Sequence, residues 1–382
     1  KQKNTKNGFD IYPSFVVGRS KDIMVRGKAF YAIWDEETGL WSTDEYDVGR
    51  LVDKELKEYA DNLNSPLATV KWMSNYSSGS WKEFKKFLKD VSDNSKQLDN
   101  KIVFADDKTD RKDYASRRLP YNLEKKKCPA WDELVGTLYS PEERQKIEWA
   151  IGSIVAGDGK DIQKFLVFYG GPGTGKSTML NIIQKMFEPY CTIFDAKALG
   201  SSNNAFSTEA FKDNPLIAIQ HDGDLSKIED NTKLNSISAH EEIIINEKHK
   251  ATYPMKINCF LFMGTNKPVK ITDAKSGILR RLIDVVPTGN LIQTARYFTL
   301  MDQVNYEFGA IAQHCLQVYR NLGKNYYQSY RPLDMQFKTD VFYNFVENYY
   351  EEFNKEEGIS LKAANEMYRQ YNEGTNVGFL MP

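Results

Sequence analysis

The sequence predicts an α/β fold in which a parallel sheet forms the core of the central domain. A short apolar run at 164–169 passes through a glycine-rich loop into a helical pattern at 178–187. Two further apolar runs, at 216–219 and 257–263, each end in polar residues. Continuous apolar runs of this length are typical of parallel strands, because helices cover such strands on both faces.

The chain has 382 residues, which exceeds the usual size of one domain, and its composition changes several times along its length. We expect a polar linker at 1–20, a small α/β or mostly helical module at 21–138, the α/β core at 139–290 and a helical C-terminal region at 291–382. Within the module, the pattern predicts a β-hairpin over 30–41. Two helices should follow, starting at the capping boxes Ser42–Glu45 and Ser80–Glu83.

Helical patterns also flank the core. Ser140 and Pro141 form a typical helix start, with Ser as the N-cap and Pro in the first position. The helix that follows should turn three isoleucines inward, namely Ile147, Ile151 and Ile154. After Pro287, apolar residues recur at steps of three and four from Phe298 to Cys315, which predicts a long amphipathic helical stretch.

Composition excludes several classes of protein. Lys and Arg total 51 against 52 Asp and Glu, so any nucleic-acid site must be a local basic patch. No apolar run approaches the roughly 18–20 residues of a membrane span, and we expect no membrane partner. The four cysteines lie far apart without metal-ligand spacing. We therefore expect reduced thiols and a cytoplasmic location.

The segment 170–178 reads Gly-Gly-Pro-Gly-Thr-Gly-Lys-Ser-Thr, which is a complete phosphate-binding loop. Its glycines allow backbone N–H groups to surround a β-phosphate, its lysine reaches the β- and γ-phosphates, and its serine hydroxyl ligates Mg²⁺. A strand before the loop and a helix after it supply the required context. The expected ATP-binding residues are Gly170, Gly171, Pro172, Gly173, Thr174, Gly175, Lys176, Ser177 and Thr178.

Acidic residues follow the apolar run at 216–219, where Mg²⁺ and an attacking water need a carboxylate. Asp222 and Asp224 are both candidates. Asp222 lies nearer the strand end, so we favour it as the metal ligand together with Ser177, which leaves Asp224 as the candidate base. The alternative is that both are solvated loop acids.

An alternating segment at 242–247, a basic tip and a second extended segment at 251–256 predict a hairpin. Lys248, His249 and Lys250 form its tip, where they can hold DNA phosphates. A basic turn of this length is also common as a plain solvated loop.

Two further features complete the candidate catalytic set. Asn266 follows the apolar run at 257–263, a position from which an amide can contact a γ-phosphate or orient a water. Arg280 and Arg281 precede the strand-like segment at 282–286. Either guanidinium can stabilise transition-state charge at a neighbouring subunit's nucleotide, or can instead form a local ion pair.

Taken in order, the elements between about 165 and 287 resemble those of superfamily 3 helicases. More closely, they resemble the phage- and plasmid-encoded primase-helicases related to the poxvirus primase-helicase. The resemblance is carried by the phosphate loop, the acids at 222 and 224, the Lys248–His249 tip, Asn266 and the arginine pair. One departure is the sequence His-Asp-Gly-Asp at 221–224, since the family usually has two adjacent acids there.

That resemblance implies a P-loop AAA+ ATPase core that assembles as a hexameric ring, binds ATP and Mg²⁺, and translocates on single-stranded DNA to unwind forked DNA. It further implies a helicase-associated N-terminal module, a primase or primase-polymerase domain upstream, and the start of a winged-helix-like module within 340–382. For a phage-encoded protein the location would be the host cytoplasm.

Two other functions fit parts of the same pattern. A ring ATPase that remodels proteins, or that works as a packaging or defence motor, would share the ATP site but use different pore residues. A nucleotide-switched scaffold that binds a replication origin would need a defective hydrolytic set. Stimulation of ATP hydrolysis by single-stranded DNA would distinguish a helicase from both of these alternatives.

Overall fold

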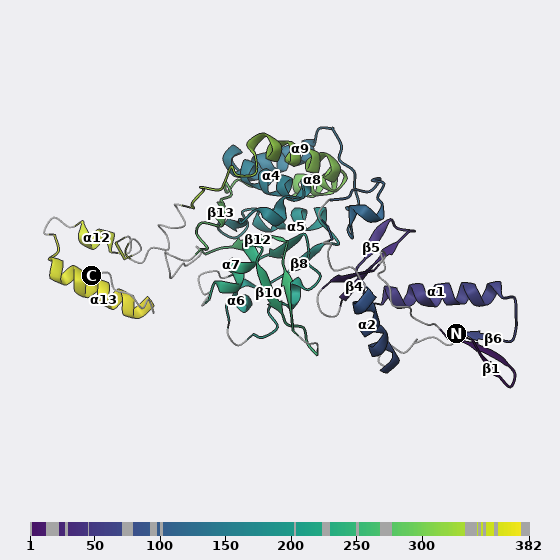
Figure 1. The fold of residues 1–382 in the computed structure, drawn as a ribbon. Coiled ribbons are helices and arrows are strands. Elements are labelled where there is room, and N and C mark those ends of the chain that lie inside the picture. Colours follow the sequence, from purple (N-terminus) through teal and green to yellow (C-terminus); the bar gives the residue numbers. More distant parts are fainter. Residues whose placement is uncertain are drawn as a thin grey trace. The chain divides into compact units, whose positions relative to one another are not determined.

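The computed structural model describes residues 2–12, 23–26, 30–44, 46–70, 79–91, 98–99, 102–201, 204–223, 230–249, 252–267, 277–332, 342, 345–346, 349–354 and 358–375. The chain divides into two compact units, Lys1–Asn122 and Leu123–Pro382 (Figure 1). The compact units thus divide after Asn122, whereas the sequence pattern predicts a domain boundary after residue 138.

The described part of the first unit contains two small sheets, two long helices and the short 3-10 helix η1 (Arg111–Asp113). One sheet has the order β1-β2-β6 and the other β3-β4-β5. The strands are β1 (Gln2–Thr5), β2 (Gly8–Ile11), β3 (Ile23–Arg26), β4 (Phe30–Asp35), β5 (Leu40–Ser42) and β6 (Ala68–Val70), and the helices are α1 (Asp47–Asn62) and α2 (Gly79–Val91). The expected hairpin at 30–41 is confirmed as β4–β5. The described part of the module contains both helices and strands, and the segment expected to be a linker contains the β1–β2 hairpin.

The capping box expected at Ser42 does not form, and the side chain of Ser80 lies outside the described residues. Ser42 ends β5, and its hydroxyl donates to the Asp47 carboxylate instead of capping a helix. Helix α1 begins later, after Tyr46, which makes no side-chain cap. Helix α2 begins at Gly79, one residue before Ser80. A Ser side chain near a helix start can thus hydrogen-bond a neighbouring side chain instead of a backbone amide of the first turn.

The second unit is built on a five-stranded parallel sheet, as the sequence predicts. Its strand order is β13-β7-β12-β9-β8, so the two later strands β9 and β12 lie between β7 and β8. The strands are β7 (Phe165–Tyr169), β8 (Cys191–Ile193), β9 (Ile217–Gln220), β12 (Phe260–Thr265) and β13 (Leu282–Val285). Because β12 adjoins both β7 and β9, the carboxyl ends of these three strands lie next to one another.

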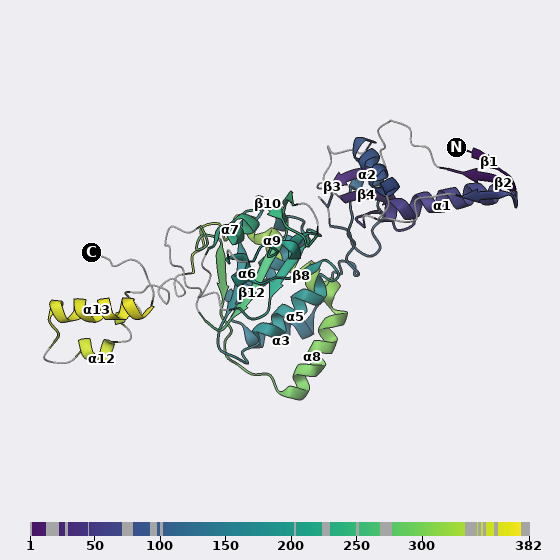
Figure 2. The same cartoon turned by 90° about the horizontal axis from the view of Figure 1, so that it is seen from below.

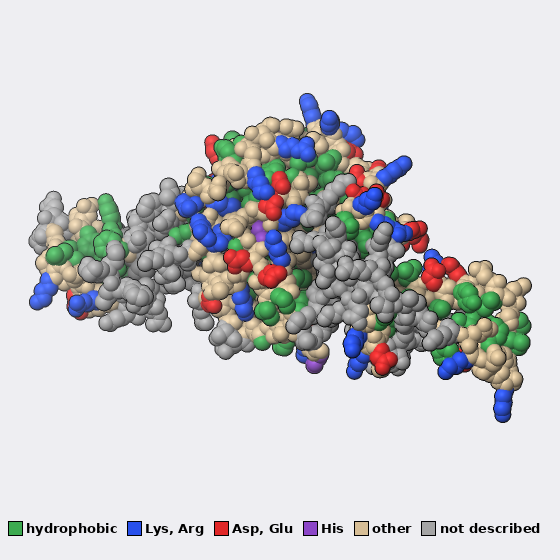
Figure 3. Space-filling view, in the orientation of Figure 1, with side chains coloured by type: hydrophobic (Ala, Val, Ile, Leu, Met, Phe, Trp, Pro, Cys, Tyr) green, Lys and Arg blue, Asp and Glu red, His purple; other side chains and the backbone are tan. Residues whose placement is uncertain are grey.

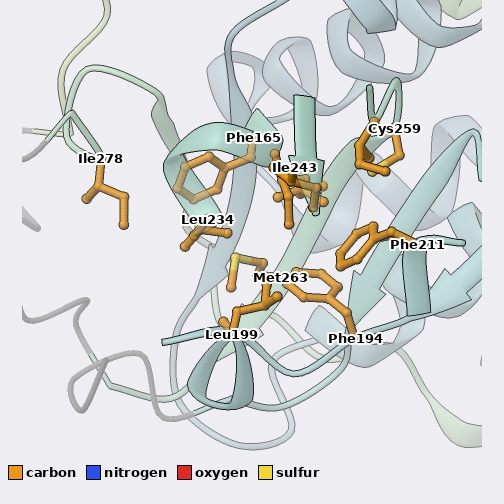
Figure 4. Packing of buried hydrophobic residues seen from close by; sticks show 14 of the residues in the cluster. Phe165, Phe194, Leu199, Phe211, Leu234, Ile243, Cys259, Met263 and Ile278 are labelled. Carbon is orange, nitrogen blue, oxygen red and sulfur yellow. The ribbon is translucent and has the colours of Figure 1, made fainter. Parts of the chain in front are cut away.

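Both faces of this sheet are covered, which explains the continuous apolar runs. Phe165 and Val167 of β7 pack on one face with residues of α6 (Ala196–Leu199), η3 (Glu209–Phe211), α7 (Thr232–Ser238) and the hairpin β10–β11 (Figure 4). Phe168 points to the other face and meets Tyr139 at 6.0 Å between ring centroids. Since successive strand residues alternate in direction, burial on both faces requires an apolar residue at each position.

Helices α3 (Pro129–Leu138), α4 (Pro141–Val155), α5 (Lys176–Met186), α8 (Thr294–Tyr306) and α9 (Phe308–Leu322) complete the second unit. In Figure 1, α4, α8 and α9 lie above the sheet, while α6 and α7 lie below it. Figure 2 shows α3, α5 and α8 grouped together. The Ser140 N-cap is confirmed, because its hydroxyl accepts a bond from the Glu143 amide, and the three isoleucines of α4 are buried.

The helical stretch expected after Pro287 is two helices, not one. The helix breaks at Glu307, between α8 and α9, and the Glu307 carboxylate accepts hydrogen bonds from the amides of Ala130 and Trp131 at 3.1 and 3.0 Å. These amides are otherwise unpaired in the first turn of α3. Phe298, which the spacing assigns to the buried stripe, is 61% exposed.

Near the C-terminus, the described residues include α12 (Tyr350–Phe353) and α13 (Leu361–Thr375). Tyr349 and Phe353 of the α12 segment contact Phe345, which also meets Tyr368 and Tyr371 of α13. An aromatic cluster thus joins these short segments. Across the described part of the whole chain, no helix combines the length and the apolar character that a membrane crossing requires.

Candidate nucleotide-binding site

The glycine-rich loop (Gly170–Gly175) joins β7 directly to α5, so the strand, loop and helix occur in the expected order. Gly173 and Gly175 have φ angles of +75° and +93°. These backbone conformations favour glycine, because a side chain would clash with the backbone. The Gly170 amide donates to the Thr265 carbonyl at 3.3 Å, which fixes the start of the loop to the end of β12.

Lys176 begins α5 and is largely buried. Its Nζ donates to the carbonyl oxygens of Gly170 and Gly171 at 2.8 and 2.6 Å. Burial lowers the pKa of Lys176, and the nearby Asp222 carboxylate partly offsets this effect. An ammonium group held over the loop in this way can exchange carbonyl partners for phosphate oxygens at small cost.

A pocket of about 290 Å³ opens beside the loop. Residues 173–178 form one wall, and Leu138, Leu291, Ile292 and Tyr297 form the rest. The Tyr297 hydroxyl lies 3.1 Å from the Thr178 hydroxyl. Sequence reasoning missed these four wall residues, since they come from α3, α8 and the segment before α8 and belong to no local motif. Apolar and aromatic walls beside a phosphate cradle suit the base and ribose of a nucleotide.

The end of β9 lies against the end of β12 beside the loop. The Gly223 amide donates to the Gly264 carbonyl at 2.9 Å. A Cβ added at Gly264 would stand 2.4 Å from the His221 carbonyl oxygen, so the close approach depends on glycine at this position. The His221 Nε2 lies 2.9 Å from Oε1 of Gln184 on α5, and burial lowers the pKa of His221.

The two predicted acids, Asp222 and Asp224, come after β9 in the sequence. Asp222 is exposed just after β9, and its negative charge raises the pKa of Lys176 against the larger effect of burial. The structure therefore brings Asp222 and the loop together. Asp224 lies outside the described residues. Among the residues that are described, no group of three or more His, Cys, Asp or Glu side chains is arranged for a metal ion.

Asn266 directly follows β12 and is exposed at the same edge of the sheet as the loop. Its neighbour Thr265 is buried, accepts the Lys267 amide at 3.1 Å and donates to the Lys267 carbonyl at 2.8 Å. These two bonds form a compact turn that holds Asn266 at the strand tip.

The expected hairpin is confirmed as β10 (Glu242–Ile245) paired antiparallel with β11 (Tyr253–Lys256). Ile243, Ile245 and Tyr253 anchor it in the core below the sheet. Lys248 and His249 are exposed at its tip, and His249 has a φ of +65°. Lys250 lies outside the described residues. The anchored strands and exposed tip leave the two described basic side chains available to a partner.

The two arginines of the predicted pair differ in solvent exposure. Arg280 is exposed, whereas Arg281 is 6% exposed and donates from Nη1 to the Gly277 carbonyl at 2.9 Å. Burial and the adjacent Arg280 lower the pKa of Arg281. Both precede β13 and lie at the amino edge of the sheet, opposite the glycine-rich loop. Within one chain, the two arginines and the loop are therefore not one site.

Comparison with known proteins gives one family match and several structural neighbours. The model of a family of unknown function (DUF5906) matches residues 168–281. The apo structure of the NrS-1 C-terminal region (305–718) is 17% identical with a TM-score of 0.41, and its A form apo structure is 18% identical with a TM-score of 0.41. Each alignment covers 66% of this chain and 64% of the NrS-1 chain. The chain thus spans a little under two thirds of these neighbours' length.

The carboxyl edge of the sheet therefore combines a glycine cradle, a lysine ammonium, a serine hydroxyl, an exposed carboxylate and an exposed amide. This donor set fits a nucleoside triphosphate with Mg²⁺, because the loop amides and Lys176 suit phosphate oxygens, while hydroxyl and carboxylate oxygens suit Mg²⁺. Ligands of open α/β sheets bind outside the carboxyl ends of the strands, which is where these groups lie.

Proposed function

We propose that this chain is an ATP-dependent DNA helicase motor that works as a hexameric ring of AAA+ type. The observation that carries the proposal is the β7–loop–α5 unit, with Lys176 buried over the loop carbonyls and Asp222 within electrostatic reach. The resemblance to phage and plasmid primase-helicases supplies the DNA substrate, the ring and an upstream primase partner. ATP hydrolysis would supply the free energy for movement along one strand.

In this proposal the loop amides and Lys176 bind the phosphates, and Ser177 with Asp222 holds Mg²⁺. Bound Mg²⁺ would offset charge on the phosphates. Asn266 is positioned to orient a water or contact the terminal phosphate. Leu138 and Tyr297 would exclude solvent from the base. Since Asp222 and Lys176 already interact, Asp222 remains our choice of metal ligand, and Asp224 remains the candidate base.

The hairpin β10–β11 is the proposed DNA contact. Lys248 and His249 are exposed while the strands behind them are anchored in the core, so a shift of the core would move the tip as a unit. Lys250 completes the proposed basic tip. Electrostatic binding to phosphates would be independent of sequence and sensitive to salt.

The test is steady-state ATP hydrolysis at low salt, with and without a single-stranded oligonucleotide, together with unwinding of a forked duplex. Lys176→Ala should abolish hydrolysis. Lys248→Ala should retain basal hydrolysis but lose both the several-fold stimulation by DNA and the unwinding. Lys256→Ala is the matched control, because Lys256 is exposed on the same hairpin but lies at its base.

Three results would contradict the proposal in different ways. ATP hydrolysis that single-stranded DNA does not stimulate would favour a ring ATPase that acts on protein, or a packaging or defence motor. Absence of hydrolysis by an assembled chain would favour a nucleotide-switched scaffold. Normal unwinding by Lys248→Ala would leave ATP hydrolysis intact but overturn the role of the hairpin tip.

Between the two arginines, exposure favours Arg280 as the group that reaches a neighbouring subunit. Arg280→Ala should leave thermal stability unchanged and lower ATP hydrolysis, because its guanidinium is exposed. Arg281→Ala should lower thermal stability, because it empties a buried position. Loss of stability in Arg280→Ala with unchanged hydrolysis would reverse this assignment.

A further inference from the structure

A second pocket, of about 510 Å³, lies at the amino edge of the same sheet, opposite the glycine-rich loop. Its charged lining residues are Lys164, Arg280, Arg281, Lys324, Arg331 and Asp161. Lys164 directly precedes β7, and the arginine pair directly precedes β13. In Figure 3, Lys and Arg side chains gather on the surface near the position of β13 in Figure 1.

Positive charge in this pocket exceeds negative charge. Among the described lining residues Asp161 is the one acid, and it already pairs with Lys324 at 2.9 Å. Within the described part of the chain, none of Lys164, Arg280, Arg281 and Arg331 lies within 4.0 Å of a carboxylate. Glu241 acts on Arg281 only as a more distant charge. Among the described residues, four of the five cations of the pocket therefore have no carboxylate partner.

Backbone carbonyl groups hold several of these cations in place. The Lys164 Nζ donates to the carbonyls of Arg280 and Tyr330, the latter at 3.2 Å. Arg331 donates from Nη1 to the Tyr330 carbonyl at 2.8 Å. Burial, with Arg331 and Arg281 nearby, lowers the pKa of Lys164 to about 8. Fixed cations that repel one another bind an anion favourably, because the anion relieves the repulsion and pre-ordered donors lose little entropy.

We propose that this amino-edge pocket binds a phosphate group. Guanidinium groups match phosphate oxygens in pairs, and the pocket supplies three of them with two lysines. Its volume accommodates a diphosphate or a nucleotide. The phosphate can come from a free ion or nucleotide, or from a nucleotide held by a second copy of this chain. The second source rests on the proposed function, and the first does not.

The first experiment measures inorganic pyrophosphate binding by calorimetry at constant ionic strength, in chains carrying Lys176→Ala so that the glycine-rich loop is weakened. Adding Lys324→Gln and Arg331→Gln should lower the affinity by about tenfold or more, since two charged hydrogen-bond donors are lost. Both side chains are partly or fully exposed, so folding should be retained, which thermal unfolding checks. Arg320→Gln, an exposed arginine on α9 outside the pocket, should bind as the parent does.

The second experiment asks whether the phosphate belongs to a second copy. The Lys324→Gln/Arg331→Gln chain with an intact loop should bind ATP but hydrolyse it slowly. Mixing it with the Lys176→Ala chain, whose pocket is intact, should restore hydrolysis. Pyrophosphate binding that the pocket variants weaken supports a free ligand, and restored hydrolysis supports the second copy.

The proposal is overturned if the pocket variants alter neither pyrophosphate binding nor hydrolysis. A parent chain that hydrolyses no ATP would contradict the proposed function alone. In that case the pyrophosphate experiment decides by itself, and an affinity that the pocket substitutions leave unchanged overturns the pocket.

Discussion

The two edges of the five-stranded sheet offer an anion different kinds of partner. At the carboxyl edge, backbone groups of one short loop surround Lys176, and Asp222 offsets part of its charge. At the amino edge, side chains from several separate segments gather positive charge around Lys164. The first edge depends on backbone geometry and the second on accumulated charge. Substitutions that change shape should therefore act most at the first edge, and substitutions that change charge should act most at the second.

The largest effect is expected from Gly264→Ala, which tests the geometry of the carboxyl edge. The added methyl group would stand 2.4 Å from the His221 carbonyl and 3.0 Å from Cδ1 of Leu180, so β9 and β12 must separate. We expect a loss of about 1–3 kcal/mol in the free energy of unfolding, measured by denaturant titration, with weaker nucleotide binding.

Gly136→Ala is the matched control for this change. Gly136 is exposed in α3, and an added Cβ would meet no atom within 4 Å. Alanine should stabilise the helix there by about 0.5–1 kcal/mol. If Gly264→Ala proved as stable as the parent, the close contact between the two strand ends would not be a constraint on the site.

A smaller, pH-dependent effect tests the accumulated charge of the amino edge. The pKa of Lys164 is lowered from 10.5 to about 8 by burial and by Arg331 and Arg281. Between these pH values the unfolded chain binds a proton that the folded chain does not, so stability should rise with pH across this window. Lys164→Met removes the titrating group and should flatten this part of the rise.

Denaturant titrations from pH 7.5 to 10.5 compare the two chains, since other groups contribute equally to both. Lys185→Met, which removes an exposed lysine on α5, should keep the parent slope. Equal slopes for Lys164→Met and the parent would mean that neither burial nor the neighbouring cations lower the pKa of Lys164 measurably.

The smallest effect is expected from Tyr297→Phe, which tests the wall of the carboxyl-edge pocket. The change removes the hydroxyl that lies 3.1 Å from Thr178 but keeps the ring. It should cost about 0.5–1.5 kcal/mol in stability and little in nucleotide affinity, measured with a fluorescent ATP analogue. A loss of affinity beyond about tenfold would mean that the hydroxyl contacts the nucleotide directly.

Local patterns predicted the parallel sheet, the loop from Gly170 to Gly175 and the β10–β11 hairpin, since each depends on neighbours in sequence. The capping box predicted at Ser42 does not form, because the Ser42 hydroxyl donates to the Asp47 carboxylate instead. The contact of Glu307 with the amides at 130 and 131 could not be foreseen, because these residues lie far apart in sequence. The same holds for the amino-edge pocket, where residues far apart in sequence, such as Lys164 and Arg331, meet only in the folded chain.

Glu307 has a further consequence for how a ligand enters and leaves. It joins the start of α3 to the α8–α9 junction, and the Arg296–Glu133 ion pair joins α8 to α3 again, with Arg296 Nε 2.7 Å from Glu133 Oε1. Leu138 ends α3, and Tyr297 lies on α8. The two helices that carry these wall residues are thus tied to each other at two places. We therefore expect α3 and α8 to move together, as one wall, if the pocket opens to admit a ligand.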